Sequence, residues 1–260
     1  MPLLTFAPLW DRLLSEGVVT ITAPELAARA GATLKTTYWA VHKAKARKKL
    51  FSPTKGLYVL VPPEYRSWGV VPADWFIDDM MRHLGRAYYL AFLTAAARHG
   101  ASHQASQLFQ VVCDGKVGDR DIGGIRLRFY TASGIAARAV QGLTGPTGSL
   151  SVATPETCVL DLADRPEAGA GINVILEVLG GLDLDVEKLV EAARLRSRAA
   201  VRRCGWFLSR THPDLKIDRL RELASPDTGD HTLLVSSGER RGSHDHGWGV
   251  VVNTLVEQAA

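Results

Sequence analysis

The sequence predicts an α+β fold in two parts, and three observations support that prediction. The 260 residues are enough for about two domains of ordinary size. Basic residues are concentrated at the start: residues 1–66 carry ten Lys and Arg against four Asp and Glu, whereas the rest carries 21 against 23. Segments with helical spacing of apolar residues alternate with short β-rich runs. We therefore predict domains at residues 1–66 and 87–260, with a linker and connecting helix at 67–86.

Composition narrows the class of protein. With 46% hydrophobic and 22% charged residues, the chain has the make-up of a soluble globular protein. No apolar run approaches the roughly 20 residues needed to cross a bilayer, and the start of the chain lacks the features of a signal peptide. Cys113, Cys158 and Cys204 are odd in number and far apart. We therefore expect buried thiols in a reducing cytoplasm rather than disulfides.

The first residues predict a small helical unit. Leucines on one face give a first helix that ends near Gly17, and Val18–Ile21 is a short β-branched run. Thr22 is placed to cap a helix over Pro24–Ala30, whose first turn holds a proline and a glutamate, as helix starts favour. Gly31 supplies the turn that follows. These elements predict the first half of a helix-turn-helix.

A second helix and a hairpin complete this unit. The helix is expected from Leu34 to Lys48, and two strands, at Phe51 and Leu57–Val61, flank a tip at Ser52–Gly56. Helix, tight turn, helix and hairpin in this order are the outline of a winged helix-turn-helix, whose second helix enters the major groove of duplex DNA. The predicted fold is therefore an N-terminal winged helix-turn-helix followed by a mixed helix-and-strand C-terminal domain.

One face of the second helix is expected to pack inward and the opposite face to be cationic. Between Lys35 and Lys55 the chain carries seven basic residues and no acid. A basic face opposite an apolar stripe favours double-stranded DNA as the partner. The alternative is a solvated surface helix that happens to be basic. The expected inward stripe is Leu34, Tyr38, Val41 and Ala44 or Lys45, and the expected outward positions are Lys35, Thr36, Trp39, Lys43 and Arg47.

Particular side chains are candidates for DNA contact. Short polar and long basic side chains on the helix can reach base edges, and basic side chains at its end and in the hairpin can reach phosphates. Trp39 has two interpretations, stacking on a sugar or base and covering the seam between helices, of which we favour the second. The groove candidates are Lys35, Thr36, Thr37 and Lys43, with His42 at the edge of the face, and the phosphate candidates are Arg47, Lys48, Lys49 and Lys55.

The second part is expected to mix helices and strands. Proline-rich Pro62–Trp75 is predicted to be a linker that packs on its neighbours, and Tyr88–His99 an apolar helix ended by a glycine. Leu108–Cys113 and Ile125–Tyr130 are β-rich and are expected to pair as a hairpin. Gly142–Gly148 is expected to be a loop.

The remaining third is predicted to be mainly helical. Thr154 and Pro155 make a sound helix start, as N-cap and first helical residue. Residues 225–247 are rich in Gly, Ser, Asp and His and are expected to be largely irregular. The expected helices are Glu156–Ala163, Ile172–Leu179 and Val186–Arg203, the last continuing through Cys204–Leu208, and the expected short strands are Leu233–Val235 and Val250–Asn253.

No catalytic constellation can be assigned from spacing. His244-Asp245-His246 offers ligand types that suit a metal, but such alternation in a Gly-rich segment favours solvated side chains. Gly142–Gly148 lacks the Lys-Ser/Thr of a phosphate-binding loop. Asp183 and Asp185 are better explained by helix capping than by acid–base catalysis. We therefore predict a protein that is not an enzyme and has no cofactor and no metal site.

Three motifs resemble a known family in their order and spacing. Ala87–Gln110 has a Tyr, an apolar Ala-rich helix, His-Gly, a polar turn and a strand, and Val152–Leu162 has a Thr-Pro-Glu helix start followed by Leu-Asp-Leu. The hairpin continues as Lys55-Gly56-Leu57-Tyr58. Together these motifs resemble the AbiEi-like antitoxins of type IV toxin–antitoxin and abortive-infection systems, over about residues 5–205. The segment after about Leu208 does not match the family pattern.

The resemblance implies a transcriptional repressor of its own operon, whose winged helix binds inverted repeats in promoter DNA. It also implies a C-terminal domain that counters a nucleotidyltransferase toxin without forming a stable complex. We expect a monomer in solution or cooperative binding on DNA. The positions to which the family's DNA-binding role carries over are Lys35, Thr36, Thr37, Lys43, Arg47 and Lys55.

Two other classes of function stay open at the level of sequence. One is an enzyme with its active site in residues 76–260, targeted to DNA by the winged helix. The other is a replication or mobile-element accessory protein with tandem winged helices, which a second basic helix would favour. Ala192–Arg203 carries five arginines, for which a solvated helix face is the favoured interpretation. They are Arg194, Arg196, Arg198, Arg202 and Arg203.

Overall fold

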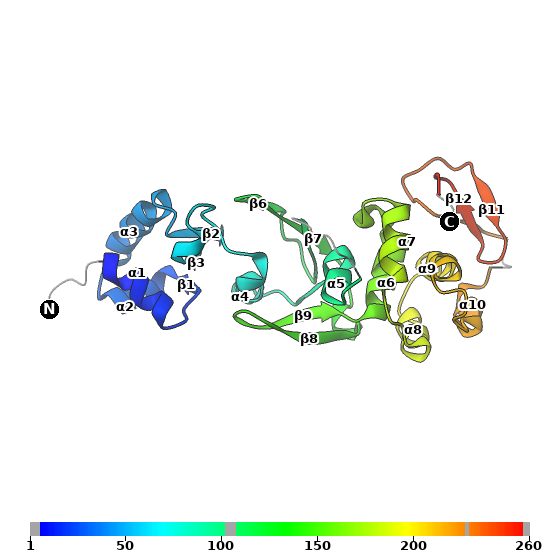
Figure 1. Ribbon diagram of the computed structural model, residues 1–260, viewed down its shortest axis with the longest axis horizontal. Coiled ribbons are helices and arrows are strands. Elements are labelled where there is room, and N and C mark those ends of the chain that lie inside the picture. Colours follow the sequence, from blue (N-terminus) through cyan, green and yellow to red (C-terminus); the bar gives the residue numbers. More distant parts are fainter. Residues whose placement is uncertain (1–5, 102–107, 227–228, 257–260) are drawn as a thin grey trace.

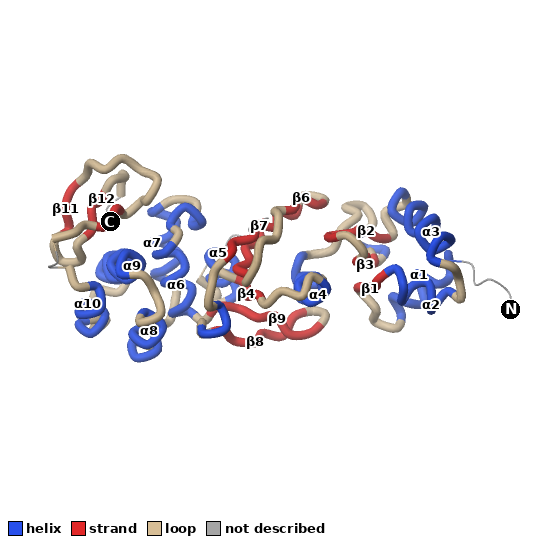
Figure 2. The backbone as a smooth tube through the Cα atoms, turned by 180° about the vertical axis from the view of Figure 1, so that it is seen from behind, coloured by secondary structure: helices blue, strands red, loops and turns tan. Residues whose placement is uncertain are grey.

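The computed structural model describes residues 6–101, 108–226 and 229–256. Figure 1 shows an elongated molecule in which the chain runs from a group of N-terminal helices, through a central sheet, to a second group of helices with a small sheet beside it. In the described residues the strands form three sheets, and Figure 2, from behind, shows them separated by helices. The predicted mixture of helices and strands in both parts of the chain is confirmed.

The N-terminal unit has three helices and a three-stranded sheet. Its strands are antiparallel in the order β1-β3-β2. The helices pack against one face of this sheet around a core that includes Leu9, Leu13, Leu26 and Val41. The order of elements predicted for this unit is confirmed. The elements are α1 (Phe6–Ser15), β1 (Thr20–Thr22), α2 (Ala23–Ala30), α3 (Leu34–Ala46), β2 (Leu50–Thr54) and β3 (Leu57–Leu60).

The hairpin of β2 and β3 also contributes to the main core of the molecule. Phe51 and Val59 belong to the large apolar cluster that continues into the central sheet. The rings of Phe51 and Phe76 meet edge to face with centroids 5.3 Å apart. Residues 62–75 pack on their neighbours as predicted, because Val71 is fully buried. The N-terminal unit is therefore joined to the rest by buried apolar contacts.

The central sheet has six strands in the order β6-β7-β5-β4-β9-β8. Two neighbouring pairs, β5 with β7 and β4 with β9, are parallel, and the other pairs are antiparallel. The strands are β4 (Tyr88–Leu90), β5 (Leu108–Cys113), β6 (Arg120–Ile122), β7 (Ile125–Thr131), β8 (Val140–Gly145) and β9 (Gly148–Ala153).

The hairpin predicted between Leu108–Cys113 and Ile125–Tyr130 is wrong. These segments, β5 and β7, are parallel neighbours, and β7 makes its hairpin with β6 instead. The turn of that hairpin is Gly123-Gly124, with φ of 55° and 89°. Two successive positive φ values are what a tight hairpin turn requires, and glycine adopts them without strain. The glycine pair was the signal for the short strand β6.

Two other predictions for this sheet are also corrected. Gly142–Gly148 is not a loop, because Gly142 pairs with Ser151 across the β8–β9 hairpin. Tyr88–His99 is not one helix: it starts as strand β4 and continues as helix α5 (Phe92–Arg98). Phe92 turns the chain from strand to helix with a φ of 52°. The two tyrosines in β4 favour a strand once β5 and β9 offer partners on both sides.

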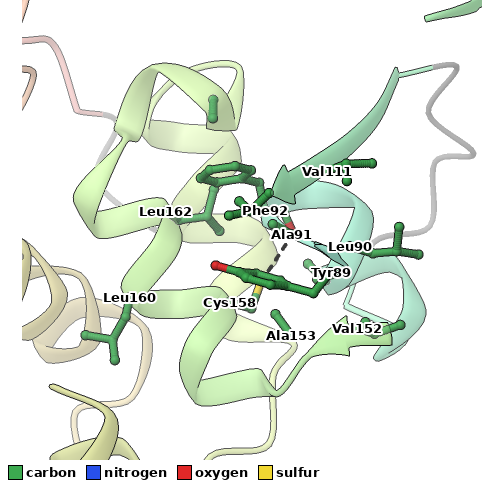
Figure 3. Packing of buried hydrophobic residues seen from close by; sticks show 14 of the residues in the cluster. Tyr89, Leu90, Ala91, Phe92, Val111, Val152, Ala153, Cys158, Leu160 and Leu162 are labelled. Atoms are coloured by element: carbon green, nitrogen blue, oxygen red, sulfur yellow. Dashed lines mark hydrogen bonds between the residues drawn. The ribbon is translucent and has the colours of Figure 1, made fainter. Parts of the chain in front are cut away.

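Helices cover the sheet and build the end of the molecule beyond it. Figure 3 shows helix α6 against β4, with Tyr89, Phe92 and Cys158 between them. The Cys158 thiol donates a hydrogen bond to the carbonyl of Phe92 at 3.3 Å. The three cysteines are free and buried, as predicted. The further helices are α4 (Ile77–His83), α6 (Pro155–Asp164), α7 (Ile172–Gly180), α8 (Val186–Ala193), α9 (Arg198–Thr211) and α10 (Asp218–Ala224).

The helix predicted over Val186–Arg203 is two helices. Alpha-helix α8 ends at Ala193, and Ser197 caps α9 by accepting a hydrogen bond from the backbone N–H of Ala200 at 3.2 Å. At the end of the chain, β10 (Thr232–Leu233), β12 (Val250–Val252) and β11 (Ser243–Asp245) form a small sheet. Strand β12 matches the strand predicted at Val250–Asn253, β10 shares only Leu233 with the one predicted at Leu233–Val235, and β11 was missed. In the part of the chain that is described, each helix is too short or too polar to cross a lipid bilayer.

Candidate nucleic-acid interface

Helices α2 and α3 are held at a fixed angle by local caps. Thr22 and Glu25 form a reciprocal cap at the start of α2, in which the Thr22 backbone N–H donates to the Glu25 carboxylate at 2.8 Å. Gly31 ends α2 in the left-handed conformation, with φ of 59°. Thr33 then caps α3 by accepting from the backbone N–H of Thr36 at 3.2 Å. The predicted Thr22 cap and Gly31 turn are confirmed, and the Thr33 cap is an addition that the sequence analysis did not make.

The buried stripe of α3 differs from the one predicted. Thr37, Ala40, Val41 and Ala44 are buried, whereas Leu34 and Tyr38 are 47% and 53% exposed. These four small side chains recur at the three- and four-residue spacing of one helical face and let α3 pack closely. Val41 and Ala44 are buried as predicted, whereas the larger residues Leu34 and Tyr38, which were also expected there, lie on the next face.

The structure removes Thr37 from the candidate DNA contacts. It is fully buried, and its hydroxyl donates to the carbonyl of Thr33 at 2.9 Å. A hydroxyl that is satisfied within the helix can occupy the packed face, so Thr37 is not available to base edges. Its neighbour Thr36 is exposed.

The outer face of α3 combines cations with an aromatic ring. Lys35, His42 and Lys43 are exposed together with Trp39, of which 62% is accessible. Trp39 therefore does not cover a seam between helices, and the interpretation that we favoured from the sequence is wrong. The ammonium group of Lys43 lies 3.5 Å from the centroid of the Trp39 ring, a cation–π contact.

The seven cations between residues 35 and 55 keep their charge available. Among the described residues, none of them forms an ion pair with a carboxylate. Lys48 donates to the carbonyl of Ser67 at 2.8 Å. Lys55 is exposed at the tip of the β2–β3 hairpin, and its carbonyl accepts a hydrogen bond from Nε2 of His83 at 3.0 Å. The hairpin tip is thus positioned by α4.

The second basic helix that the sequence suggested is not a cationic surface. Arg202 and Arg203 are 1% and 7% exposed, and the side chain of Arg196 is 5% exposed. Arg202 donates to the carbonyls of Ala224, Ser225 and Asp230 at 2.7–3.0 Å. The remaining two, Arg194 and Arg198, are exposed. Three of the five arginines are therefore internal structural groups, and the solvated face that we favoured is also wrong.

A buried ionic cluster lies between α6 and the central sheet. Oδ1 of Asp161 accepts hydrogen bonds from Arg138 at 3.0 Å, from Arg196 at 2.7 Å and from the Tyr89 hydroxyl at 3.3 Å. Burial raises the pKa of Asp161, against the opposing effect of the two guanidinium groups. Burial likewise raises the pKa of Tyr89 above its ordinary value. One carboxylate is thus shared by two guanidinium groups, and the cluster joins α6 and β4 to the segments that carry Arg138 and Arg196.

The motif residues that carried the family resemblance have structural roles in this part of the chain. Nε2 of His99 donates to the carbonyl of Ala153 at 2.7 Å. The Glu156 carboxylate is buried and accepts from the backbone N–H of Asp185 at 3.1 Å. Thr154 caps α6 as predicted. These contacts tie α5, β9, α6 and α8 into one body.

The residues of the other candidate sites make structural contacts. Asp245 pairs with Arg210 at 3.2 Å and accepts from the Trp248 backbone at 3.1 Å. The rings of His231 and His244 meet with centroids 4.8 Å apart. In the described residues, no three His, Cys, Asp or Glu side chains are arranged to hold a metal ion. Asp185 caps α8, as the sequence indicated.

Comparison with known proteins identifies the second part of the chain. Residues 89–210 match the model of a family described as the AbiEi antitoxin C-terminal domain. A crystal structure of the RV2827C protein from Mycobacterium tuberculosis has a similar fold, with a TM-score of 0.67 at 16% sequence identity, over 94% of this chain and 89% of that chain. At this identity the likeness shows a common fold. No curated protein matches the chain.

Proposed function

Because residues 89–210 belong to the AbiEi antitoxin C-terminal domain family, we propose that this chain is the antitoxin and autoregulator of a type IV toxin–antitoxin system. Residues 1–66 act as a winged helix-turn-helix that binds repeats in the promoter of its own operon. Residues 87–260 counter a nucleotidyltransferase-like toxin without a stable complex, and the chain itself is not an enzyme. The observation that carries the proposal is the unpaired cationic face of α3 in a chain with this antitoxin domain.

The DNA-binding role of α3 is supported by its surroundings. Its buried stripe holds it against α2 and the sheet, so its outer face is presented rigidly. Side chains on that face can reach base edges from the major groove, and side chains at its end can reach phosphates. The proposed groove contacts are Lys35, Thr36, Trp39, His42 and Lys43, and the proposed phosphate contacts are Arg47, Lys48, Lys49 and Lys55.

The hairpin tip supports the role of a wing. Lys55 extends from the turn between β2 and β3, and the contact between its carbonyl and His83 fixes the tip relative to α4. The strands of the hairpin are anchored by Phe51 in the main core. A wing whose tip and strands are both fixed in the free protein loses little conformational entropy when it binds a phosphate backbone.

A gel-shift experiment tests the DNA-binding half of the proposal. We expect Lys43→Ala with Arg47→Ala to abolish binding to a fragment of the protein's own promoter at about 0.15 M salt, with an unchanged far-UV circular dichroism spectrum. The matched control is Arg194→Ala with Arg198→Ala, which removes two exposed arginines around the start of α9. Retained binding in the first variant, or equal loss in both, would refute the assignment of α3.

Co-expression tests the antitoxin half. A nucleotidyltransferase-like protein encoded beside this gene should arrest growth alone and be neutralised when this chain is co-expressed. The Lys43→Ala, Arg47→Ala variant should still neutralise it from a foreign promoter, because the antitoxic domain is separate from α3. Failure of the wild-type chain to restore growth would refute the antitoxin role while leaving the DNA-binding assignment to the gel shift.

A further inference from the structure

The outer face of α3 carries an apolar patch in the middle of its cations. Leu34, Tyr38 and Trp39 are all about half exposed or more. Exposed apolar side chains that cluster on one face mark an interaction surface more often than isolated ones do. This patch lies on a helix that carries Lys35, Lys43 and Lys45 and no acidic residue, so its partner must accept both apolar and cationic contacts.

Helix geometry places this patch where a groove-bound helix would meet the DNA bases. At about 100° per residue, the middle of the buried stripe lies between Ala40 and Val41. The opposite line of the helix passes close to Lys35, Trp39 and His42. Tyr38 lies about 70° to one side of this line and Lys43 about 70° to the other. Trp39 is therefore near the centre of the outer face, and Tyr38 lies between that centre and Leu34.

We propose that Trp39 and Tyr38 recognise thymine methyl groups in the major groove, which makes α3 a reader of A·T base pairs. The inference rests on the proposed DNA-binding function and specifies its sequence preference. The C5 methyl of thymine is the apolar group that the major groove displays, and apolar side chains contact it. Lys43, held against the Trp39 ring at 3.5 Å, places a cation beside that contact.

Charge complementarity favours DNA over a protein as the occupant of this face. Lysine is depleted from protein–protein interfaces, and the centre of such an interface is poor in charge. Here the aromatic side chains are flanked by Lys35 and Lys43, and the described residues offer those two cations no carboxylate. A polyanion with an apolar group on its base edges fits both features.

Replacing thymine by uracil tests the inference directly, because it removes the methyl group and leaves every base-pair hydrogen bond and phosphate in place. The probe is the promoter fragment upstream of this reading frame, made with either thymidine or deoxyuridine throughout. Each methyl contact that is lost should weaken binding about fourfold. With two contacts we expect the wild-type chain to bind the uracil fragment about 15-fold more weakly at the same salt concentration.

Variants assign the effect to the two side chains. Tyr38→Ala and Trp39→Ala should each bind thymine DNA more weakly and show a smaller ratio between the thymine and uracil fragments. In the double variant that ratio should approach one. Lys35→Ala should weaken binding to both fragments equally and keep the ratio. Trp68→Ala, which removes an exposed tryptophan outside α3, should leave the ratio unchanged.

The outcomes separate this inference from the function on which it rests. Equal binding of the wild-type chain to both fragments overturns the methyl-reading role while promoter binding stands. A ratio that persists in the double variant overturns the assignment to Tyr38 and Trp39. Loss of self-association in the double variant, with an unchanged ratio, assigns the patch to a protein contact instead. Absence of binding to either fragment refutes the DNA-binding function and this inference together.

Discussion

Helices α3 and α9 are both rich in basic residues, but two arginines of α9 occupy an environment opposite to that of the α3 lysines. The lysines of α3, and Arg47 at its C-cap, lie on an exposed face without carboxylate partners among the described residues. In α9, Arg202 and Arg203 are buried and donate to backbone carbonyls of the segments that follow. Positive charge therefore forms a surface in α3, whereas two of the four arginines of α9 are internal scaffolding.

The difference lies in the hydrogen bonds that arginine and lysine side chains can make. A guanidinium group presents five donors in a rigid plane, so Arg202 can meet three carbonyls at once and be buried. A lysine ammonium is strongly hydrated and stays at the surface unless it has a close partner. A count of basic residues along a helix does not reveal a cationic surface, because burial depends on acceptors supplied by distant parts of the chain.

The largest expected effect is the loss of stability when a buried arginine of α9 is removed. Arg202→Ala removes a buried guanidinium that donates to the carbonyls of Ala224, Ser225 and Asp230, so the free energy of unfolding should fall by about 3 kcal/mol or more. Lys43→Ala, on the exposed helix, should change it by less than about 0.5 kcal/mol. Urea denaturation measures both, and similar values for the two variants would contradict the contrast.

The second effect concerns Asp161, the buried acid shared by two arginines. Asp161→Ala leaves Arg138 and Arg196 without their common carboxylate, and the free energy of unfolding should fall by about 3 kcal/mol. Asp11→Ala removes an exposed pair with Arg66 at 3.4 Å and should cost less than about 1 kcal/mol. Thermal denaturation of the two variants makes the comparison, and an equal cost would show that the cluster is not a scaffold.

A smaller effect concerns the exposed cations of α3 and the salt dependence of DNA binding. If about five phosphates are neutralised, log K for promoter binding should fall with log salt at a slope of about −4 to −5. Arg47→Ala, which removes one proposed phosphate contact, should make this slope shallower by about one unit. Fluorescence anisotropy across a salt series provides the measurement. A slope that instead responds to Arg194→Ala with Arg198→Ala would move the interface toward α9.

The smallest effect tests the cap of α2, which supports α3. Hydrogen bonds from Thr22 lower the pKa of Glu25 from its ordinary value of 4.5, so its stabilising contribution is present above that value and is lost as the pH falls through the lowered pKa. Glu25→Gln should therefore cost about 0.3–1 kcal/mol at neutral pH and almost nothing near about pH 3. Urea denaturation at both values checks this, and a cost independent of pH would contradict it.

The N-terminal unit was predictable from sequence because its signals are local. Thr22, Glu25 and Gly31 act within one or two turns of the backbone, and the structure places them as predicted. The central sheet was less predictable because strand partners come from distant segments. The parallel pairing of β5 with β7 depends on the insertion of β6, for which Gly123-Gly124 was the single local signal.

The candidate interface shows the same division on a smaller scale. The sequence supplied its helix, its cations and its position between a turn and a hairpin. It did not supply the helix rotation, since Thr37 is buried where Tyr38 was expected. Small side chains occupy the packed face because α3 lies close to its neighbours. The hydrophobicity of the residues does not by itself predict how closely the helix packs.

By itself, the sequence determined the order of the N-terminal elements, the helix caps, the concentration of charge near the start of the chain and the family of residues 89–210. Each of these depends on residues that are close together in the sequence or on a motif that can be recognised from the sequence alone. Only the tertiary structure decided which cations are exposed, which aromatic side chains share their face and which strands pair. Those outcomes depend on acceptors and packing surfaces supplied from elsewhere in the fold.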